Sequence, residues 1–335
     1  MSYNDVEELL EAVRVETENL DTSEYIGITD KEIVRFLNIA QRQLQSKIVK
    51  KSPNEFGKFY FPQEITEEGA VQVYNMPIDS FMRSKVSSLW LDGCLQKMVY
   101  SHNINSYDTS TSCGDCHMNY CQCGGNATEC GYTVIGNKIH LTRDTKSYRG
   151  CKVPDSVRIL YCQALPNIEQ AAIKFTASSG VNITSGILNV DATFCYDANA
   201  ISNKYKWTLV DCDGNQVARN VRISDFDTQA LTVTLSDSNT TEYLDTSSYG
   251  TLASGELPNI DLYLVRGFNS STHCQLEPLA MDYITRYAII KLLQRDGSSE
   301  YQVHSRDLVA MLAEIEEAYS YVTDDIMSIA QFPED

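Results

Sequence analysis

Cysteine and histidine form the clearest group of metal-binding residue types in this sequence. The chain has 335 residues and eleven cysteines, and five of these fall between positions 113 and 130. Zinc is bound by four ligands that converge tetrahedrally, and a C-x2-C pair supplies two of them at the right reach. One interpretation of this loop is therefore a structural zinc ion, with ligands from the set Cys113, Cys116, His117, Cys121, Cys123 and Cys130. We expect no other cofactor.

The rest of this loop leaves other interpretations open. The C-x4-C-x-C run that ends at Cys123 is not a standard second pair of zinc ligands. Disulfides formed after cell lysis, or free thiols in an interface loop, are the alternatives. Cysteine-nucleophile chemistry would need a histidine held beside an activated thiolate, and the histidines near this loop are close to it in sequence only.

Other chemical motifs are incomplete. Asp211, Asp213 and Asn215 imitate the start of a calcium loop, but the glycine and the distal glutamate at EF-hand spacing are missing. A hairpin turn at Asp213-Gly214 is the simpler interpretation. The chain contains no G-x-G-x-x-G, P-loop, HExxH or GxSxG motif on a suitable framework. None of these motifs therefore identifies a catalytic residue.

The helix that could position a binding surface is predicted over 29–51. Thr29 and Glu32 have capping-box spacing, and Ser52-Pro53 ends the helix. Its apolar stripe consists of Ile33, Leu37, Ala40, Leu44 and Ile48. The cations Lys31, Arg35, Arg42 and Lys47 lie off that stripe. They form either a basic edge that meets an acidic neighbouring subunit, or an ordinary solvated face.

An apolar stripe of this length needs partner helices. We predict two at the end of the chain, over 276–295 and 305–329, and a short one near 4–19. Tyr283 and Tyr287 of the first, and Leu312 and Ile315 of the second, would complete the core of the bundle. The N-terminal and C-terminal segments therefore close one helical bundle.

The middle of the chain has the sequence pattern of β-strands. Short strands over 56–166, with hairpin turns at Asp92-Gly93 and Gly136-Asn137, predict a small β-domain. The segment 168–257 is rich in Thr, Ser, Val, Asn and Asp and predicts an inserted, immunoglobulin-like β-sandwich. The run 260–266 shows the same strand pattern as the first half of the chain, so we expect it to continue the strands of that half. We expect an α+β fold, with a core domain of 1–166 and 258–335 that carries the cysteine-rich loop 101–131, and an inserted domain of 167–257.

The bulk composition restricts the partners. The formal net charge is −18, which argues against wrapping nucleic acid by phosphate neutralisation. No apolar run approaches the length of a membrane span, and we expect no signal peptide. Twenty tyrosines favour buried surfaces between proteins.

Several short motifs follow one another in a characteristic order along the chain. Their residues are Asn38, Ala40, Gln41, Asp79, Phe81, Arg83, Ser84, Val86, Asp92, Gly93, Asp282, Tyr283 and Ala288. These motifs and the order of the predicted elements resemble those of the head–tail connector, or adaptor, family of tailed bacteriophages. The resemblance covers about 29–166 and 260–321 and omits the cysteine loop and the predicted sandwich.

The resemblance implies a non-enzymatic virion protein at the head–tail junction, synthesised in the cytoplasm of a host bacterium. Its partners would be the portal, neighbouring copies in a ring that is usually dodecameric, and the next tail-ring, tail-tube or fibre protein. DNA would pass through the ring without sequence-specific binding. Arg35, Arg42 and Lys47, with Gln331, Phe332 and Pro333 of the C-terminal tail, would form portal or subunit contacts.

A second interpretation is a tail-associated module that binds a receptor or fibre through the predicted sandwich. A third, a zinc-dependent enzyme, would require turnover that chelation abolishes.

Overall fold

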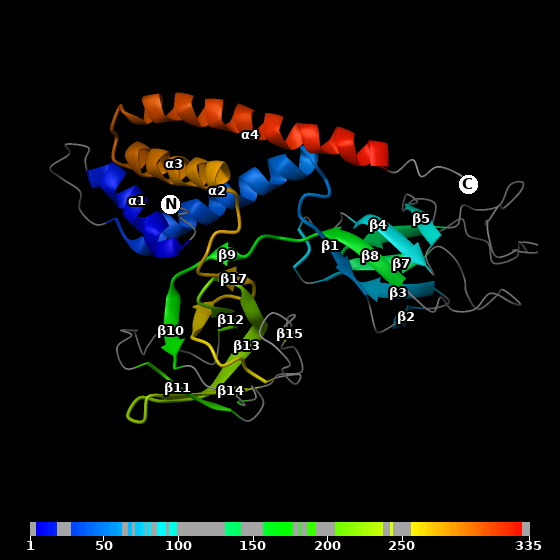
Figure 1. Cartoon of the computed structure of the whole chain (residues 1–335), viewed down its shortest axis with the longest axis horizontal. Helices are drawn as coiled ribbons and strands as arrows, with labels where there is room; N and C mark the ends of the chain where they lie inside the picture. The colour runs from blue at the N-terminus through cyan, green and yellow to red at the C-terminus, as the bar shows by residue number, and fades with distance from the viewer. Residues whose placement is uncertain are drawn as a thin grey trace, which may run out of the picture. The chain divides into compact units, whose positions relative to one another are not determined.

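The computed structural model describes residues 5–18, 28–61, 66–68, 71–77, 79–81, 86–91, 94–98, 131–141, 157–176, 181, 186–191, 205–236, 242–243 and 256–329. The chain divides into two compact units. The first contains Met1–Lys47 and Leu165–Asp335, and the second contains Ile48–Ala164. Both helices and β-sheets are present, so the α+β class is confirmed (Figure 1).

The described helices are those predicted, with small shifts at their ends: α1 Val6–Glu18, α2 Asp30–Lys51, α3 Pro278–Arg295 and α4 Tyr301–Ile329. The amides of Glu32 and Ile33 donate to the carbonyl of Thr29, which begins α2 at the expected residue. α4 begins at Tyr301 rather than 305. None of the helices in this described part is long and apolar enough to span a membrane.

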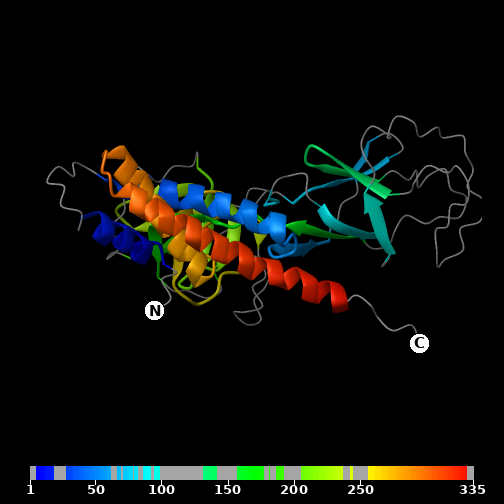
Figure 2. The same ribbon diagram turned by 90° about the horizontal axis from the view of Figure 1, so that it is seen from above.

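The centre of the bundle is α3. Its sequence suggested one apolar stripe, but its buried residues lie around most of the helix. A helix that is apolar on all sides is buried by its neighbours. α3 packs against α1 and α4, and Arg295 at its end pairs with Glu32 at the start of α2, at 2.5 Å between Nη1 and Oε2. Figure 2 shows α4 running along the bundle from the turn that follows α3.

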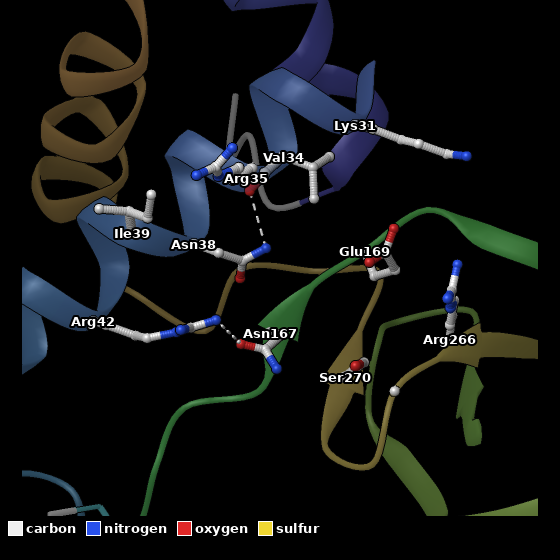
Figure 3. Close-up of a pocket in the computed structure, with 11 residues that line it drawn as sticks. Lys31, Val34, Arg35, Asn38, Ile39, Arg42, Asn167, Glu169, Arg266 and Ser270 are labelled. Carbon is white, nitrogen blue, oxygen red and sulfur yellow. Dashed lines mark hydrogen bonds between the residues drawn. The ribbon is translucent and has the colours of Figure 1, made fainter. Parts of the chain in front are cut away.

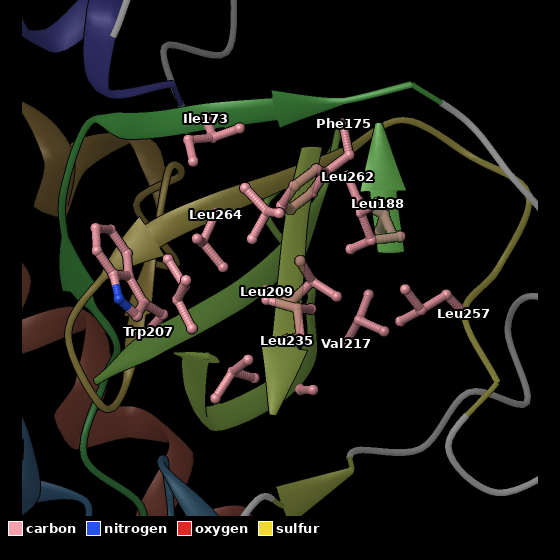
Figure 4. Packing of buried hydrophobic residues seen from close by; sticks show 14 of the residues in the cluster. Ile173, Phe175, Leu188, Trp207, Leu209, Val217, Leu235, Leu257, Leu262 and Leu264 are labelled. Carbon is pink, nitrogen blue, oxygen red and sulfur yellow. The ribbon is translucent and has the colours of Figure 1, made fainter. Parts of the chain in front are cut away.

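The first unit also holds a seven-stranded antiparallel sheet with the order β10-β16-β12-β13-β14-β11, in which β15 pairs with β13. Its strands are β10 Ala171–Phe175, β11 Ile187–Asn189, β12 Trp207–Asp211, β13 Gln216–Asp227, β14 Thr232–Ser236, β15 Glu242–Tyr243 and β16 Leu262–Arg266. Figure 4 shows large apolar side chains of these strands, including Trp207, Leu209 and Leu264, gathered inside the sheet. All three are fully buried.

This sheet differs from the two stacked sheets that we expected of a sandwich. The described strands form one curled sheet, whose end strands approach each other through a bridge between Phe175 and Val190. The physical reason lies in β13, which has 12 residues. Its first half pairs with β12 and its second half with β14, and register irregularities interrupt both pairings. Such irregularities bend a strand and increase its twist, which allows one sheet to enclose the core.

The prediction was wrong for the segment 260–266. We expected it to resume the strands of the first half, but it forms β16, between β10 and β12 of the curled sheet. Its alternation of apolar residues fits any half-buried strand. The alternation therefore predicted a strand at this position, but it could not predict which strands lie beside it.

The second unit contains an eight-stranded sheet with the order β1-β8-β4-β5-β6-β7-β3-β2. Its strands are β1 Gly57–Tyr60, β2 Thr66–Glu68, β3 Val71–Asn75, β4 Val86–Leu91, β5 Cys94–Met98, β6 Gly131–Ile135, β7 Lys138–Leu141 and β8 Val157–Cys162. The two predicted hairpins are confirmed by register, with Leu91 opposite Cys94 and Ile135 opposite Lys138. Gly136 has a φ of 65°, as a tight turn between strands requires.

Candidate functional site: a cation-lined groove

One side of the candidate site is formed by a buried polar face of α2. Asn38 is 8% exposed and binds both backbone groups of Ile168. Its Nδ2 donates to the carbonyl of Ile168 at 2.7 Å, and its Oδ1 accepts from the amide of Ile168 at 2.8 Å. The side-chain amide of Asn38 therefore hydrogen-bonds the backbone of Ile168 as the backbone of a neighbouring strand would.

Two glutamines extend the same face along α2. Gln41 Nε2 donates to the carbonyl of Pro166 at 2.7 Å, and Gln45 Oε1 accepts from the amide of Leu165 at 3.3 Å. The thiol of Cys274 donates to Gln41 Oε1 at 3.8 Å. Both glutamines are 1% exposed, so their hydrogen bonds are made away from water. We call Asn38, Gln41 and Gln45 the polar ladder.

The segment held by the polar ladder also pairs with a second segment from late in the chain. β9 (Asn167–Ile168) pairs in parallel with β17 (Ser270–Ser271). The amide of Glu169 donates to the carbonyl of Ser271 at 3.0 Å. β9 is therefore held between α2 and β17, which come from distant parts of the sequence; Asn38 and Ile168 alone are separated by 130 positions.

A hollow of about 610 Å³ lies where α2 meets these segments (Figure 3). Its walls combine cationic, polar and apolar side chains. They are Lys31, Val34, Arg35, Asn38, Ile39, Arg42, Asn167, Glu169, Arg266, Gly267 and Ser270. All of these residues belong to the first unit. We call this hollow the groove.

The groove contains four cations and one carboxylate. Three of the cations, Lys31, Arg35 and Arg42, come from the basic edge predicted on α2 and are exposed. The fourth, Arg266, lies at the end of β16. Lys47, the remaining residue of the predicted edge, is not among the residues that line the groove.

Two of the arginines are held in place by neighbours. Arg42 Nη2 donates to Asn167 Oδ1 at 3.1 Å. The guanidinium carbon of Arg266 lies 3.9 Å from the centre of the Tyr205 ring, a cation–π distance. Held side chains lose less conformational freedom when they bind a ligand, which favours binding.

Glu169 is the acidic member of the groove. Figure 3 shows it between Lys31 and Arg266. Burial raises the pKa of its carboxyl group, while its backbone hydrogen bond and the charges of Arg266 and Lys31 lower that pKa in part. The cations therefore outnumber the anion whether or not Glu169 is protonated.

The chemistry that this set favours is anion binding. Guanidinium groups bind carboxylates and phosphates through paired N–H donors, and hydrogen bonds between charged groups are roughly twice as strong as neutral ones. Val34 and Ile39 add apolar surface to the walls. A ligand that carries carboxylates beside small apolar groups would match both features.

The predicted bundle-core residues can be compared with their burial. Ile33, Leu37, Ala40, Leu44, Ile48, Tyr283 and Ile315 are buried. Tyr287 and Leu312 are only partly buried.

Two groups of predicted site residues lie outside the described residues. They are the predicted metal ligands, Cys113, Cys116, His117, Cys121, Cys123 and Cys130, and the predicted tail contacts, Gln331, Phe332 and Pro333. The zinc ion therefore stays a prediction. Among the described residues, no group of His, Cys, Asp and Glu is arranged to bind a metal.

The calcium-like sequence at Asp211 forms the predicted hairpin turn. The Asp211 carboxylate accepts from the amides of Asp213 and Asn215, at 3.0 and 2.7 Å. Gly214 has a φ of 76°, and a Cβ there would lie 2.5 Å from the side chain of His273. Turn geometry and close packing therefore account for these residues.

Asp79, one of the residues behind the family resemblance, stabilises the second unit. It is 4% exposed. It accepts from Tyr161 Oη at 3.0 Å and from Gln163 Nε2 at 2.9 Å. These bonds tie the turn that contains Asp79 to β8 and the residue that follows it.

An exposed aromatic cluster on the eight-stranded sheet was not predicted. The Arg158 guanidinium lies 3.6 Å from the ring centre of Phe59 and 5.6 Å from that of Trp90. Phe59 and Phe61 are 42% and 60% exposed. The pairing of β1, β8 and β4 brings these residues together from three separate segments, so no local pattern identified the cluster.

No protein-family model matches this chain, and the search of curated proteins found no significant match.

Proposed function

We propose that this chain is a structural virion protein that assembles as a ring between the portal and the tail. The ring would extend the DNA channel and provide the platform on which the next tail component assembles. The observation that supports this proposal most is the groove, which concentrates four cations on a chain with a formal net charge of −18. The family resemblance supplies the identity of the neighbours.

A cationic site on an acidic chain suits association between identical copies. Copies that each carry a large negative charge repel one another, so stable association needs local attraction that outweighs the general repulsion. Complementary charge at an interface also fixes the register of the partners. When two different surfaces of the same protein meet, the contact repeats and can close into a ring. The groove is suited to be one of those two surfaces.

The remaining acidic surface suits the proposed DNA channel. A wall that attracted phosphate would hold DNA by releasing its counterions, whereas a like-charged wall lets it pass. In this proposal the chain has no catalytic role and no sequence-specific contact with DNA. The portal lies on one side of the ring, and the next tail-ring, tail-tube or fibre protein lies on the other.

Co-sedimentation with isolated portal particles tests this proposal. We expect saturable binding, with a fixed number of copies for each portal particle, and weaker binding as salt concentration rises. Failure to bind portal particles at low salt would contradict the proposal. If the chain stayed off the portal but bound cell-surface glycan, the tail-associated receptor-binding module would replace it.

A further inference from the structure

The outward face of α4 is an exposed surface in the same unit as the groove. Val303 is 61% exposed, and Asp307, Ala310 and Glu314 are also exposed. Spacings of three and four residues place these four on one side of the helix. We call them the α4 stripe. The side chains of Asp307 and Glu314 make no hydrogen bond or ion pair with any residue in the described part of the chain.

We propose that the α4 stripe of one copy docks into the groove of the next copy. This inference rests on the proposed ring and names the two surfaces that meet in it. The groove offers cations beside apolar wall residues. The α4 stripe offers two carboxylates beside a valine and an alanine. A helix that lays one face into a groove of its partner is a common mode of protein recognition, and here the charges of the two surfaces are also complementary.

The arrangement of the unit requires that the two surfaces meet between copies. In Figure 1, α4 lies on the side of α3 away from β9 and β17, which border the groove. Ile315 and Tyr319 are buried on the inner side of α4, so the α4 stripe points away from its own bundle. A contact between the groove and the α4 stripe is therefore head-to-tail, the type that generates rings.

Charge reversal on each surface tests the proposal. A groove variant carries Lys31→Glu and Arg35→Glu, at two exposed positions whose side chains make no hydrogen bond with the described residues. A stripe variant carries Asp307→Lys and Glu314→Lys. We expect each variant alone to assemble on portal particles at least about tenfold more weakly than the unchanged chain, because like charges then face each other. Circular dichroism melting of each variant should match that of the unchanged chain.

Complementation makes the test specific. In a head-to-tail ring, a groove with reversed charge attracts an α4 stripe with reversed charge. We therefore expect the chain that carries all four substitutions to assemble again, and an equimolar mixture of the groove and stripe variants to do so as well. Recovery in both experiments supports the proposal, and failure to recover in either of them overturns it.

A matched control uses the acidic face of α1. Glu8 and Glu11 are exposed, and their replacement by lysine changes the net charge as much as the stripe substitutions do. We expect Glu8→Lys with Glu11→Lys to leave assembly unchanged and not to rescue the groove variant. Rescue by this control would assign the groove to α1 instead and overturn the proposal.

The outcomes separate this inference from the proposed function. If the unchanged chain does not assemble on portal particles, the proposed function fails. If it assembles and the groove and stripe variants assemble equally well, the ring remains supported and only the contact between groove and stripe is overturned. Salt-sensitive binding of duplex DNA that the groove variant loses would also overturn it, because the groove would then be occupied by phosphate.

Discussion

Asn38 stabilises the fold by pairing with both backbone groups of Ile168. A helix side chain that replaces a neighbouring strand is effective only when it is buried, because water would otherwise compete for the same groups. Ile168 is fully buried. Without Asn38, its amide and carbonyl would both lose a partner inside the protein.

Replacement of Asn38 by alanine should lower the free energy of unfolding by about 2–4 kcal/mol, since two buried backbone groups become unsatisfied. Thermal and urea unfolding measure this effect. Gln43→Ala is the control, because Gln43 is an exposed residue of the same helix. It should change stability by less than about 0.5 kcal/mol. Equal effects of the two substitutions would show that the Asn38 pairing contributes little.

The thiol of Cys274 should be unreactive in the folded protein. Burial raises its pKa from 9.0 to about 12. The folded state therefore holds this proton more tightly than the unfolded chain does. The resulting contribution to stability is complete below the unfolded pKa and is lost as the pH rises from about 9 toward about 12.

Alkylation at about pH 8, followed by mass mapping, tests this prediction. Cys212 is exposed and serves as the internal control. We expect Cys212 to be labelled in the native protein and Cys274 to be labelled only after unfolding. Labelling of both residues at the same rate would contradict the predicted burial.

The zinc prediction can be tested by elemental analysis. Purified protein should contain about one zinc ion per chain, and Cys113→Ser with Cys116→Ser should remove it. Chelation should then lower the melting temperature, because a structural metal contributes its binding energy to folding. Metal-free protein with unchanged melting would support the free-thiol or disulfide alternatives.

At the scale of elements, α2 uses two buried faces. Its apolar stripe follows the helical period, so the sequence alone predicted it. The polar ladder follows the same period, at positions 38, 41 and 45, but polar residues on a helix normally indicate a solvated face. The structure instead places the backbone of Leu165 and Pro166, which precede β9, against Gln41 and Gln45. The family resemblance marked Asn38 and Gln41 but gave no physical role for them.

Leu44→Asp should prevent cooperative folding of the first unit, because it places a charge at a fully buried position of α2. Leu37→Asp should have the same effect. Leu44→Ala should fold with a stability loss of about 2–5 kcal/mol. Circular dichroism and thermal melting distinguish these outcomes.

The control for helix propensity is Gln43→Asp, which introduces the same residue on the exposed side of α2. It should fold, and it should assemble on portal particles like the unchanged chain. A Leu44→Asp protein that still assembled would show that the bundle is not organised around this helix.

In the β-sheets, the strand positions could be predicted from the sequence, but the order of the strands could not. Strand positions and hairpin turns follow from alternation and from turn residues such as Gly136, and these were predicted. Strand neighbours depend on contacts between distant segments, and alternation carries no information about them. For that reason β16 was assigned to the wrong sheet, and the curled sheet was expected to be two stacked sheets.

At the scale of the molecule, charge is distributed unevenly. The chain is strongly acidic, yet four cations surround one groove. Three of them could be predicted, because they share one helix. Arg266 and Glu169 could not, because the pairing of β9 with β17 brings them to α2 from other parts of the chain. A groove whose walls come from three segments is a property of the folded unit.

In the proposed assembly, identical copies associate head to tail into a ring on the portal. Electron cryo-microscopy of the purified chain mixed with portal particles tests it most directly. We predict a closed ring on the portal, with the groove of each copy occupied by α4 of its neighbour. Portal particles that carry only isolated copies, or no added density, would contradict the proposed ring.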